Sequence, residues 1–265
     1  MAFSTCPNDT FVFHALVHGL VPGAPAIDVT YADVDVTNTA TAQGKYDLVK
    51  VSYAALPWLL DGYRLLPCGG ALGRGCGPLV LTRDGRPDLT GARVAVPGER
   101  TTAYLLMRLW AGDQHPAAIE VVPFAEIMPG VRDGRYDAGL VIHEARFTYA
   151  GYGLTALVDL GQWWEGSTGH PIPLGAILAR RSLDADELTR VVRASVDYAF
   201  AHPDASTGYV AEHAAEMDPD VQRQHIELYV NSFSRDLGAE GYAAIELLLG
   251  RAHQAGLVPA FGPLR

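Results

Sequence analysis

Two stretches decide the fold: GKYDLVKVSYAA at residues 44–55 and GRYDAGLVIHEARFTY at residues 134–149. In each, a glycine, a tyrosine and an aspartate stand at the same spacing, and an apolar run typical of a buried strand follows. A helical pattern precedes both copies, so each reads as a helix, a turn and a strand that ends in polar residues. The quasi-repeat predicts an α/β protein with two similar lobes.

Composition narrows the class of protein. The 265-residue chain is 49% hydrophobic, enough for a substantial core, and its formal net charge is −10. The acidic balance argues against a nucleic-acid surface, which needs clustered lysines and arginines. Residues 1–10 lack the features of a signal peptide, and no run reaches the roughly 20 apolar residues of a membrane span. Three cysteines, an odd number, fit a reducing compartment, so we expect a cytoplasmic protein without a membrane partner.

Strand-like runs alternate with helical patterns over the first two thirds of the chain. The predicted strands are residues 2–4, 27–32, 48–51, 79–82, 93–96, 119–122, 139–142 and 174–179. Beyond about residue 180 we expect four helical segments. The turn-rich GRPDLTG at 85–91 and PIPLG at 171–175 are suited to connections between lobes. We therefore assign residues 1–90 plus 175–265 to lobe I, with the C-terminal helices, and residues 91–174 to lobe II.

Polar residues stand at the end of both repeated strands. In open α/β sheets, ligands bind beyond the carboxyl ends of the strands. The first copy places Lys50, Val51 and Ser52 there, and the second places His143 and Glu144. A neutral imidazole is a good general base near neutral pH, and Glu144 could orient it or face solvent. A buried histidine satisfied by the backbone is the common alternative.

Two further segments are candidates for anion binding. In VPGERTTAYLL, Thr101 and Thr102 begin a predicted helix, where free backbone N–H groups could hold a carboxylate; simple N-capping is the default interpretation. GGALGRGCGP at 69–78 has five glycines and Arg74, but it matches neither a P-loop nor a dinucleotide fingerprint. It is either a flexible hinge or a loop that closely approaches a planar ligand, with Arg74 as the anion partner.

The first predicted turn, TCPNDTF at residues 5–11, has Asn8 and Asp9 at positions typical of a helix cap. We expect capping and also count both residues as candidate ligand contacts. His14 and His18 are one helical turn apart, but we expect them to act separately and predict no metal. HEARF, residues 143–147, lacks the second histidine of HExxH, which excludes a zinc peptidase of that type.

Several motifs together resemble one enzyme family. They are TCPNDTFVFHALVHG, KVSYAA, GGALGRGCGPL, VAVPGERTTAYLL, IMPGV, GLVIHEARFTY, DLGQWWE and PIPLGAILARR. In this order they are similar to the 1,4-dihydroxy-6-naphthoate synthases, lyases of the futalosine route to menaquinone. Thr5 departs from the family's SPCPNDTF motif, in which a proline is expected at that position.

The resemblance implies a two-lobed, periplasmic-binding-protein-like (type II) fold with a ligand cleft between lobes. It also implies a carbon–carbon lyase that splits cyclic dehypoxanthine futalosine into 1,4-dihydroxy-6-naphthoate and dihydroxyacetone. His143 corresponds to the proton acceptor, and Lys50 to Ser52 and the Thr101–Thr102 segment fall on substrate-binding positions. The substrate is a small carboxylate, and no cofactor is required because ring aromatisation drives the cleavage.

Two other functions remain open on the sequence. One is a non-catalytic solute-binding or sensor protein of the same fold, because a fold does not by itself imply catalysis. The other is a chorismate dehydratase of the same pathway, which shares the fold and a carboxylate ligand. Oligomeric state does not follow from the sequence.

Overall fold

The computed structural model describes residues 1–215 and 218–265. Contacts divide the chain into two compact units, Met1–Gly73 with Pro173–Arg265 and Arg74–Ile172. The first crossing lies at residues 73–74 rather than near residue 90, because the strand at 79–82 pairs with strands of the second unit. The second crossing lies at residues 172–173, within the predicted PIPLG segment.

The first unit is built on a mixed sheet with the order β2-β1-β3-β11-β4, in which β5 also pairs with β11. β1 is parallel to β2 and β3, whereas β11 is antiparallel to β3 and β4. Its strands are β1 (Ala2–Phe3), β2 (Thr30–Tyr31), β3 (Leu48–Ser52), β4 (Tyr63–Leu65), β5 (Ala71–Gly73) and β11 (Ile172–Arg180).

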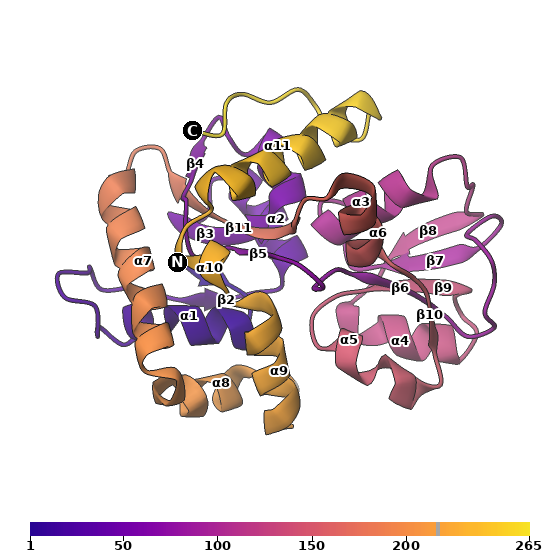
Figure 1. Cartoon of the computed structure of the whole chain (residues 1–265), viewed down its shortest axis with the longest axis horizontal. Helices are drawn as coiled ribbons and strands as arrows, with labels where there is room; N and C mark the ends of the chain where they lie inside the picture. The colour runs from indigo at the N-terminus through magenta and orange to yellow at the C-terminus, as the bar shows by residue number, and fades with distance from the viewer. Residues whose placement is uncertain (216–217) are drawn as a thin grey trace. The chain divides into compact units, whose positions relative to one another are not determined.

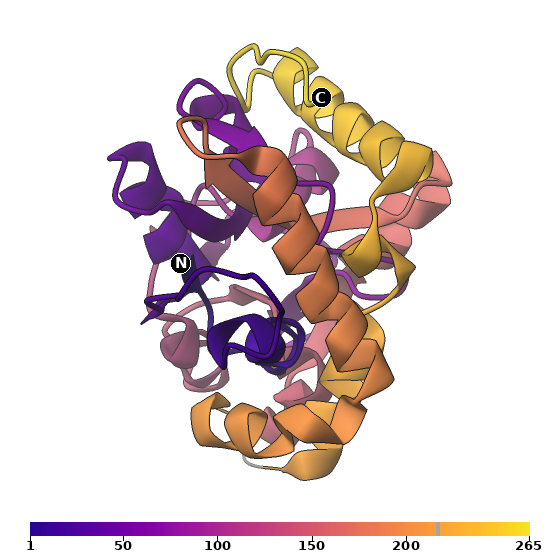
Figure 2. The same cartoon turned by 90° about the vertical axis from the view of Figure 1, so that its left-hand side faces the viewer.

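Helices cover both faces of this sheet. They are α1 (Pro7–Val17), α2 (Val34–Ala42), η1 (Tyr53–Trp58), α7 (Ala185–Ala201), η3 (Pro203–Ser206), α8 (Thr207–His213), α9 (Pro219–Tyr229), α10 (Ser232–Arg235) and α11 (Gly238–Gln254). Alternate strand residues point to opposite faces. Val49 and Leu178 pack with the α11 side, and Leu48 and Ile177 pack with α1 and α7. Figure 1 shows α11 and α1 on opposite sides of the sheet, and Figure 2 shows α7 running beside α1.

The second unit has a five-stranded sheet with the order β10-β6-β9-β7-β8. Its strands are β6 (Leu79–Thr82), β7 (Arg93–Val96), β8 (Ala118–Val121), β9 (Ala138–Val141) and β10 (Thr155–Asp159). Its helices are α3 (Thr102–Ala111), α4 (Phe124–Arg132), α5 (Ala145–Thr148), η2 (Tyr149–Tyr152) and α6 (Leu160–Thr168). In Figure 1, α4 lies on one face of the sheet and α3 with α6 on the other.

The repeated turn is present in both units. Gly44 follows α2 with φ 72°, and Gly134 follows α4 with φ 75°, a left-handed conformation that glycine adopts without steric cost. In each case the backbone then enters a buried strand, β3 or β9. The helix–glycine–strand interpretation of the two stretches is therefore confirmed.

All eight predicted strands are present, with ends shifted by a few residues, but three strands were missed. β4 and β5 have three residues each, and β10 is a partly exposed edge strand, so none of them forms a long buried run. After residue 180, the described residues contain short helical segments, α10 and η3, besides the four longer helices. No helix in residues 1–215 or 218–265 has the length and apolarity needed to cross a bilayer.

Candidate functional site

His143 has an unusual backbone conformation in the second unit. β9 ends at Val141, and His143 then adopts φ 58°; among the described residues other than glycine, it alone has a positive φ. This left-handed conformation costs an ordinary residue about 1–2 kcal/mol. Such strain is concentrated at functional sites, where the surrounding structure imposes it. The half-buried imidazole packs edge-on against Phe124, with ring centroids 5.6 Å apart.

The segment after His143 is held by a partly buried arginine. Glu144 precedes the short helix α5, and Arg146 within that helix donates to Gly77 O at 2.8 Å and to Asp159 Oδ2 at 2.6 Å. The Arg146 and Asp159 side chains are 18% and 12% exposed. Asp159 also caps α6 by accepting from the N–H groups of Gly161 and Gln162. One carboxylate therefore fixes both α6 and the segment that presents His143.

The glycine-rich segment makes a close approach inside the protein. A Cβ added at Gly161 would lie 2.7 Å from Gly77 N, so the two backbones pack with no room for a side chain. Arg146 bonds to the carbonyl of this same Gly77. The close approach observed at Gly77 is to the backbone of α6. The expected approach of this segment to a planar ligand stays a prediction.

Arg74 is exposed and donates to Gly169 O at 3.1 Å. The adjacent Gly75 N–H donates to Glu165 Oε1 at 2.7 Å, so the loop is tied to the end of α6. The expected part of Arg74 in anion binding stays a prediction.

Thr101 caps α3. Its Oγ1 accepts from Tyr104 N at 3.1 Å and donates to Gly98 O at 2.8 Å. The default interpretation, N-capping, is therefore confirmed for Thr101. Thr102 is the first residue of the helix, and both threonines are 2% exposed.

In the first unit, Asp9 and Lys50 form a buried ion pair between α1 and β3. Asp9 also accepts from Ser4 Oγ at 2.7 Å and from Asn8 Nδ2 at 2.8 Å. The expected capping by Asn8 and Asp9 is wrong: Cys6 is the N-cap, Pro7 begins α1, and both residues lie within the first turn. Their side chains are buried because they belong to this network.

The same network extends to α9. Because Asn8 Nδ2 faces the Asp9 carboxylate, Asn8 Oδ1 faces His225 Nε2, 3.0 Å away. The carbonyl oxygen only accepts, so His225 Nε2 carries a hydrogen and donates it. His225 is 1% exposed and lies 217 residues from Asn8, which is why no motif indicated it.

Asp47, three residues before Lys50 in the sequence, pairs with a different residue. Arg180 Nε lies 2.8 Å from Asp47 Oδ1 in a pair that is largely exposed. Asp9 therefore compensates the positive charge of Lys50 on β3. As a result, this strand can offer a ligand hydrogen bonds but little net positive charge.

Val51 and Ser52 complete this strand. The Val51 side chain belongs to the hydrophobic core, so only its main chain is available to a ligand. Ser52 N donates to Asn38 Oδ1 at 2.8 Å, and Asn38 Nδ2 donates to Ser52 Oγ at 3.1 Å. Asn38, fully buried on α2, was not a sequence candidate because an asparagine in a helix has no distinguishing spacing.

Among the described residues, the three cysteines Cys6, Cys68 and Cys76 form no disulfide. Burial raises the pKa of Cys68 and of Cys76 to about 12, which makes both poor nucleophiles. His14 and His18 have ring centroids 4.5 Å apart, and His18 Nδ1 lies 2.9 Å from His14 O. Burial, and then the neighbouring His18, lower the pKa of His14.

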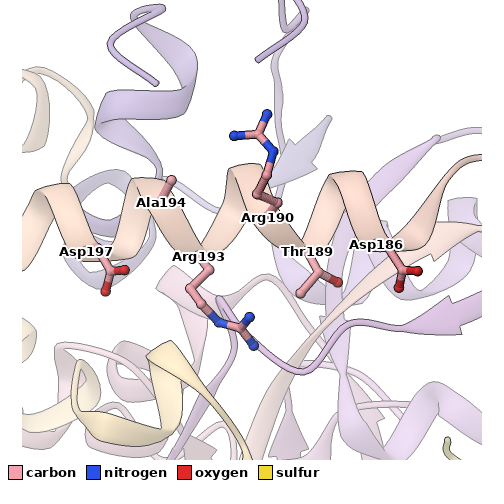
Figure 3. Close-up of a pocket in the computed structure, with 6 residues that line it drawn as sticks. All are labelled: Asp186, Thr189, Arg190, Arg193, Ala194 and Asp197. Carbon is pink, nitrogen blue, oxygen red and sulfur yellow. The ribbon is translucent and has the colours of Figure 1, made fainter. Parts of the chain in front are cut away.

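A surface hollow lies along α7, and none of the residues that line it is a predicted site residue. Figure 3 shows Arg190 and Arg193 pointing to opposite sides of the helix. Arg190 pairs with Glu187 at 2.6 Å and Arg193 with Asp236 at 2.9 Å. Both arginines are already in ion pairs, so this hollow does not compete as the candidate site.

Comparison with known proteins agrees with these motifs. A family model described as menaquinone biosynthesis matches residues 1–254. A Streptomyces coelicolor protein named 1,4-dihydroxy-6-naphthoate synthase is 65% identical over 99% of this chain and 95% of its own length. A Thermus thermophilus protein of the same name is 47% identical over 100% of this chain and 97% of its own length.

Solved structures agree on the fold. A crystal structure of a protein from Archaeoglobus fulgidus is 33% identical, with TM-score 0.90 and 97% coverage of both chains. The periplasmic aliphatic sulphonate binding protein of Escherichia coli is 14% identical, with TM-score 0.70 over 100% of this chain and 89% of its own. The fold is thus periplasmic-binding-protein-like, and the chain belongs to the menaquinone-biosynthesis family.

Proposed function

We propose that this chain is a carbon–carbon lyase, a 1,4-dihydroxy-6-naphthoate synthase that cleaves cyclic dehypoxanthine futalosine to 1,4-dihydroxy-6-naphthoate and dihydroxyacetone. The 65% identity to a full-length relative of that name supports the reaction. The observation that carries the catalytic assignment is the strained backbone of His143, at the end of a buried strand.

His143 acts as the proton acceptor. Its neutral imidazole removes a proton from the substrate, the carbon–carbon bond breaks in retro-aldol fashion, and the electron pair is left on the ring portion as an enolate. Aromatisation of the new ring drives this step, which is redox-neutral overall. Hydrogen-bond donors that hold the developing enolate oxygen lower the barrier.

The other expected residues serve binding. The proposed contacts from the first unit are Lys50, Val51 through its main chain, Ser52, Asn8 and Asp9. Asp9 also pairs with Lys50 and accepts from Asn8. In the second unit, the start of α3 at Thr101 and Thr102 suits a substrate carboxylate, with Arg74 as a further anion partner and Glu144 beside the base. The partner is a small-molecule carboxylate, with no nucleic acid or membrane, and the three free thiols support a cytoplasmic location.

The test is to incubate the purified protein with cyclic dehypoxanthine futalosine and follow the naphthoate by absorbance and mass. His143→Asn is the sharper variant, because asparagine tolerates a positive φ and cannot act as the base. It should lower turnover by about 10²-fold or more with unchanged thermal stability. His115→Asn, an exposed histidine of the same unit, is the matched control and should retain full turnover.

Unchanged turnover in His143→Asn would remove this residue from the mechanism. Substrate binding without any product in the wild-type protein would favour a binding or sensor protein. Absence of both would make chorismate, followed by its dehydration, the next substrate to test.

A further inference from the structure

Asn38 and Ser52 exchange two hydrogen bonds at the end of β3. Asn38 Oδ1 lies 2.8 Å from Ser52 N, and Asn38 Nδ2 lies 3.1 Å from Ser52 Oγ. Asn38 is 0% exposed and Ser52 is 3% exposed. Two contacts to one residue leave the asparagine amide no freedom to turn.

The direction of both bonds follows from chemistry. A backbone N–H only donates, so the Asn38 atom that faces Ser52 N must be the carbonyl oxygen. The atom that faces Ser52 Oγ is then the NH₂ group, which also only donates. The Ser52 hydroxyl is therefore an acceptor toward Asn38, and its own hydrogen points to another group. In residues 1–215 and 218–265, Ser52 Oγ has no acceptor for that hydrogen.

We propose that Asn38 is a positioning residue that makes Ser52 a hydrogen-bond donor to an oxygen of the substrate, a carboxylate or carbonyl. This inference rests on the proposed function and adds a residue to it. The nearest cation on the same strand, Lys50, already pairs with Asp9. A substrate oxygen at the end of β3 therefore meets little net positive charge, and Ser52 supplies a neutral donor whose direction is set.

Substitutions of Asn38 should affect KM in an unusual order. Asn38→Asp keeps the shape and still accepts from Ser52 N, but its carboxylate also accepts the Ser52 hydroxyl hydrogen and so withdraws it from the substrate. Asn38→Ala removes the amide without adding a competing acceptor. Asn38→Asp should therefore raise KM by about tenfold or more, the scale of one lost hydrogen bond to a charged group, and Asn38→Ala should raise it less.

A purely structural role for Asn38 predicts the opposite order. Alanine leaves Ser52 N–H without its buried acceptor and creates a cavity, so it would be the more damaging change. The discriminating measurement is KM and kcat of both variants on the same substrate, with kcat expected to stay within about threefold. Thr39→Ala, on the exposed side of the same helix, is the control with unchanged KM.

Ser52→Ala completes the test. It removes the hydroxyl and should raise KM as much as Asn38→Asp does, and the double variant should be no worse than Ser52→Ala alone. The inference is overturned if the increases in KM of the two single variants multiply in the double variant. It is also overturned if KM is higher for Asn38→Ala than for Asn38→Asp. Either result leaves the lyase activity established. If Asn38→Asp does not fold, a normal KM in Ser52→Ala overturns it independently. Wild-type protein that neither binds nor cleaves the substrate overturns the proposed function, and the inference with it.

Discussion

Replacing Asp9 by asparagine tests the buried ion pair of the first unit. The Lys50 and Asp9 side chains are 9% and 2% exposed, so water cannot compensate either charge. Asp9→Asn keeps the shape but leaves the Lys50 ammonium buried beside a neutral amide. Breaking a buried pair in this way costs about 3–5 kcal/mol.

The other hydrogen bonds of Asp9 determine how much stability each variant loses. Asp9 accepts from Ser4 and Asn8 as well as from Lys50, so in Lys50→Met the carboxylate still keeps two donors. Lys50→Met should therefore cost less than Asp9→Asn. The double variant removes both charges and should be more stable than Asp9→Asn alone, because no uncompensated charge remains.

Urea unfolding of the purified protein measures these differences. With a slope of about 2–3 kcal/mol/M, Asp9→Asn should lower the midpoint by about 1–2 M. Asp47→Asn is the matched control, because its pair with Arg180 has side chains that are 70% and 33% exposed and should contribute about 0–1 kcal/mol. A midpoint for Asp9→Asn no lower than that of Asp47→Asn would refute the reasoning.

Three further predictions concern packing, capping and pH. Gly161→Ala should lower the thermal midpoint, at a cost of about 1–3 kcal/mol, because the added Cβ meets Gly77. The Cβ of Gly166→Ala on the same helix meets nothing within 4 Å, so this control should raise the midpoint. Equal effects of the two variants would contradict the close packing. Thr101→Ala should cost about 1 kcal/mol through loss of the α3 cap, measured by urea unfolding, and an unchanged midpoint would show that the cap is dispensable. The pKa of His14 is lowered in the folded state, so the protein should be fully stable above the ordinary histidine pKa and lose stability as the pH drops below it. His14→Gln should therefore make the thermal midpoint depend less on pH. An unchanged pH dependence would exclude His14 as its source.

Local signals predicted much of the fold. The repeated glycine after a helical pattern marked the entry into β3 and β9, because only glycine adopts that left-handed turn without cost. Asp218 caps α9, which begins at Pro219, and Gly256 follows the end of α11 with a positive φ; residue types such as these are local signals of helix ends. The short strands β4 and β5 gave no such signal, because three residues are too few to show a period.

The candidate site was predicted in part. His143 was recognised by its position after an apolar run, but its positive φ could not be inferred, since only a few per cent of residues other than glycine adopt that conformation. The glycines of the 69–78 segment suggested a close backbone approach, yet their partner at Gly77, α6, lies far along the chain. Asn38 and His225 were missed because neither belongs to a motif.

By itself, the sequence determined where most of the helices and the longer strands lie and which residues end the repeated strands, because propensity, periodicity and turn chemistry act over a few neighbouring residues. Only the tertiary structure decided which polar groups meet. Lys50 pairs with Asp9 across 41 residues, and His225 donates to Asn8 across 217. A buried polar group must find a partner, but which partner it finds depends on the packing of distant elements, which no local pattern encodes.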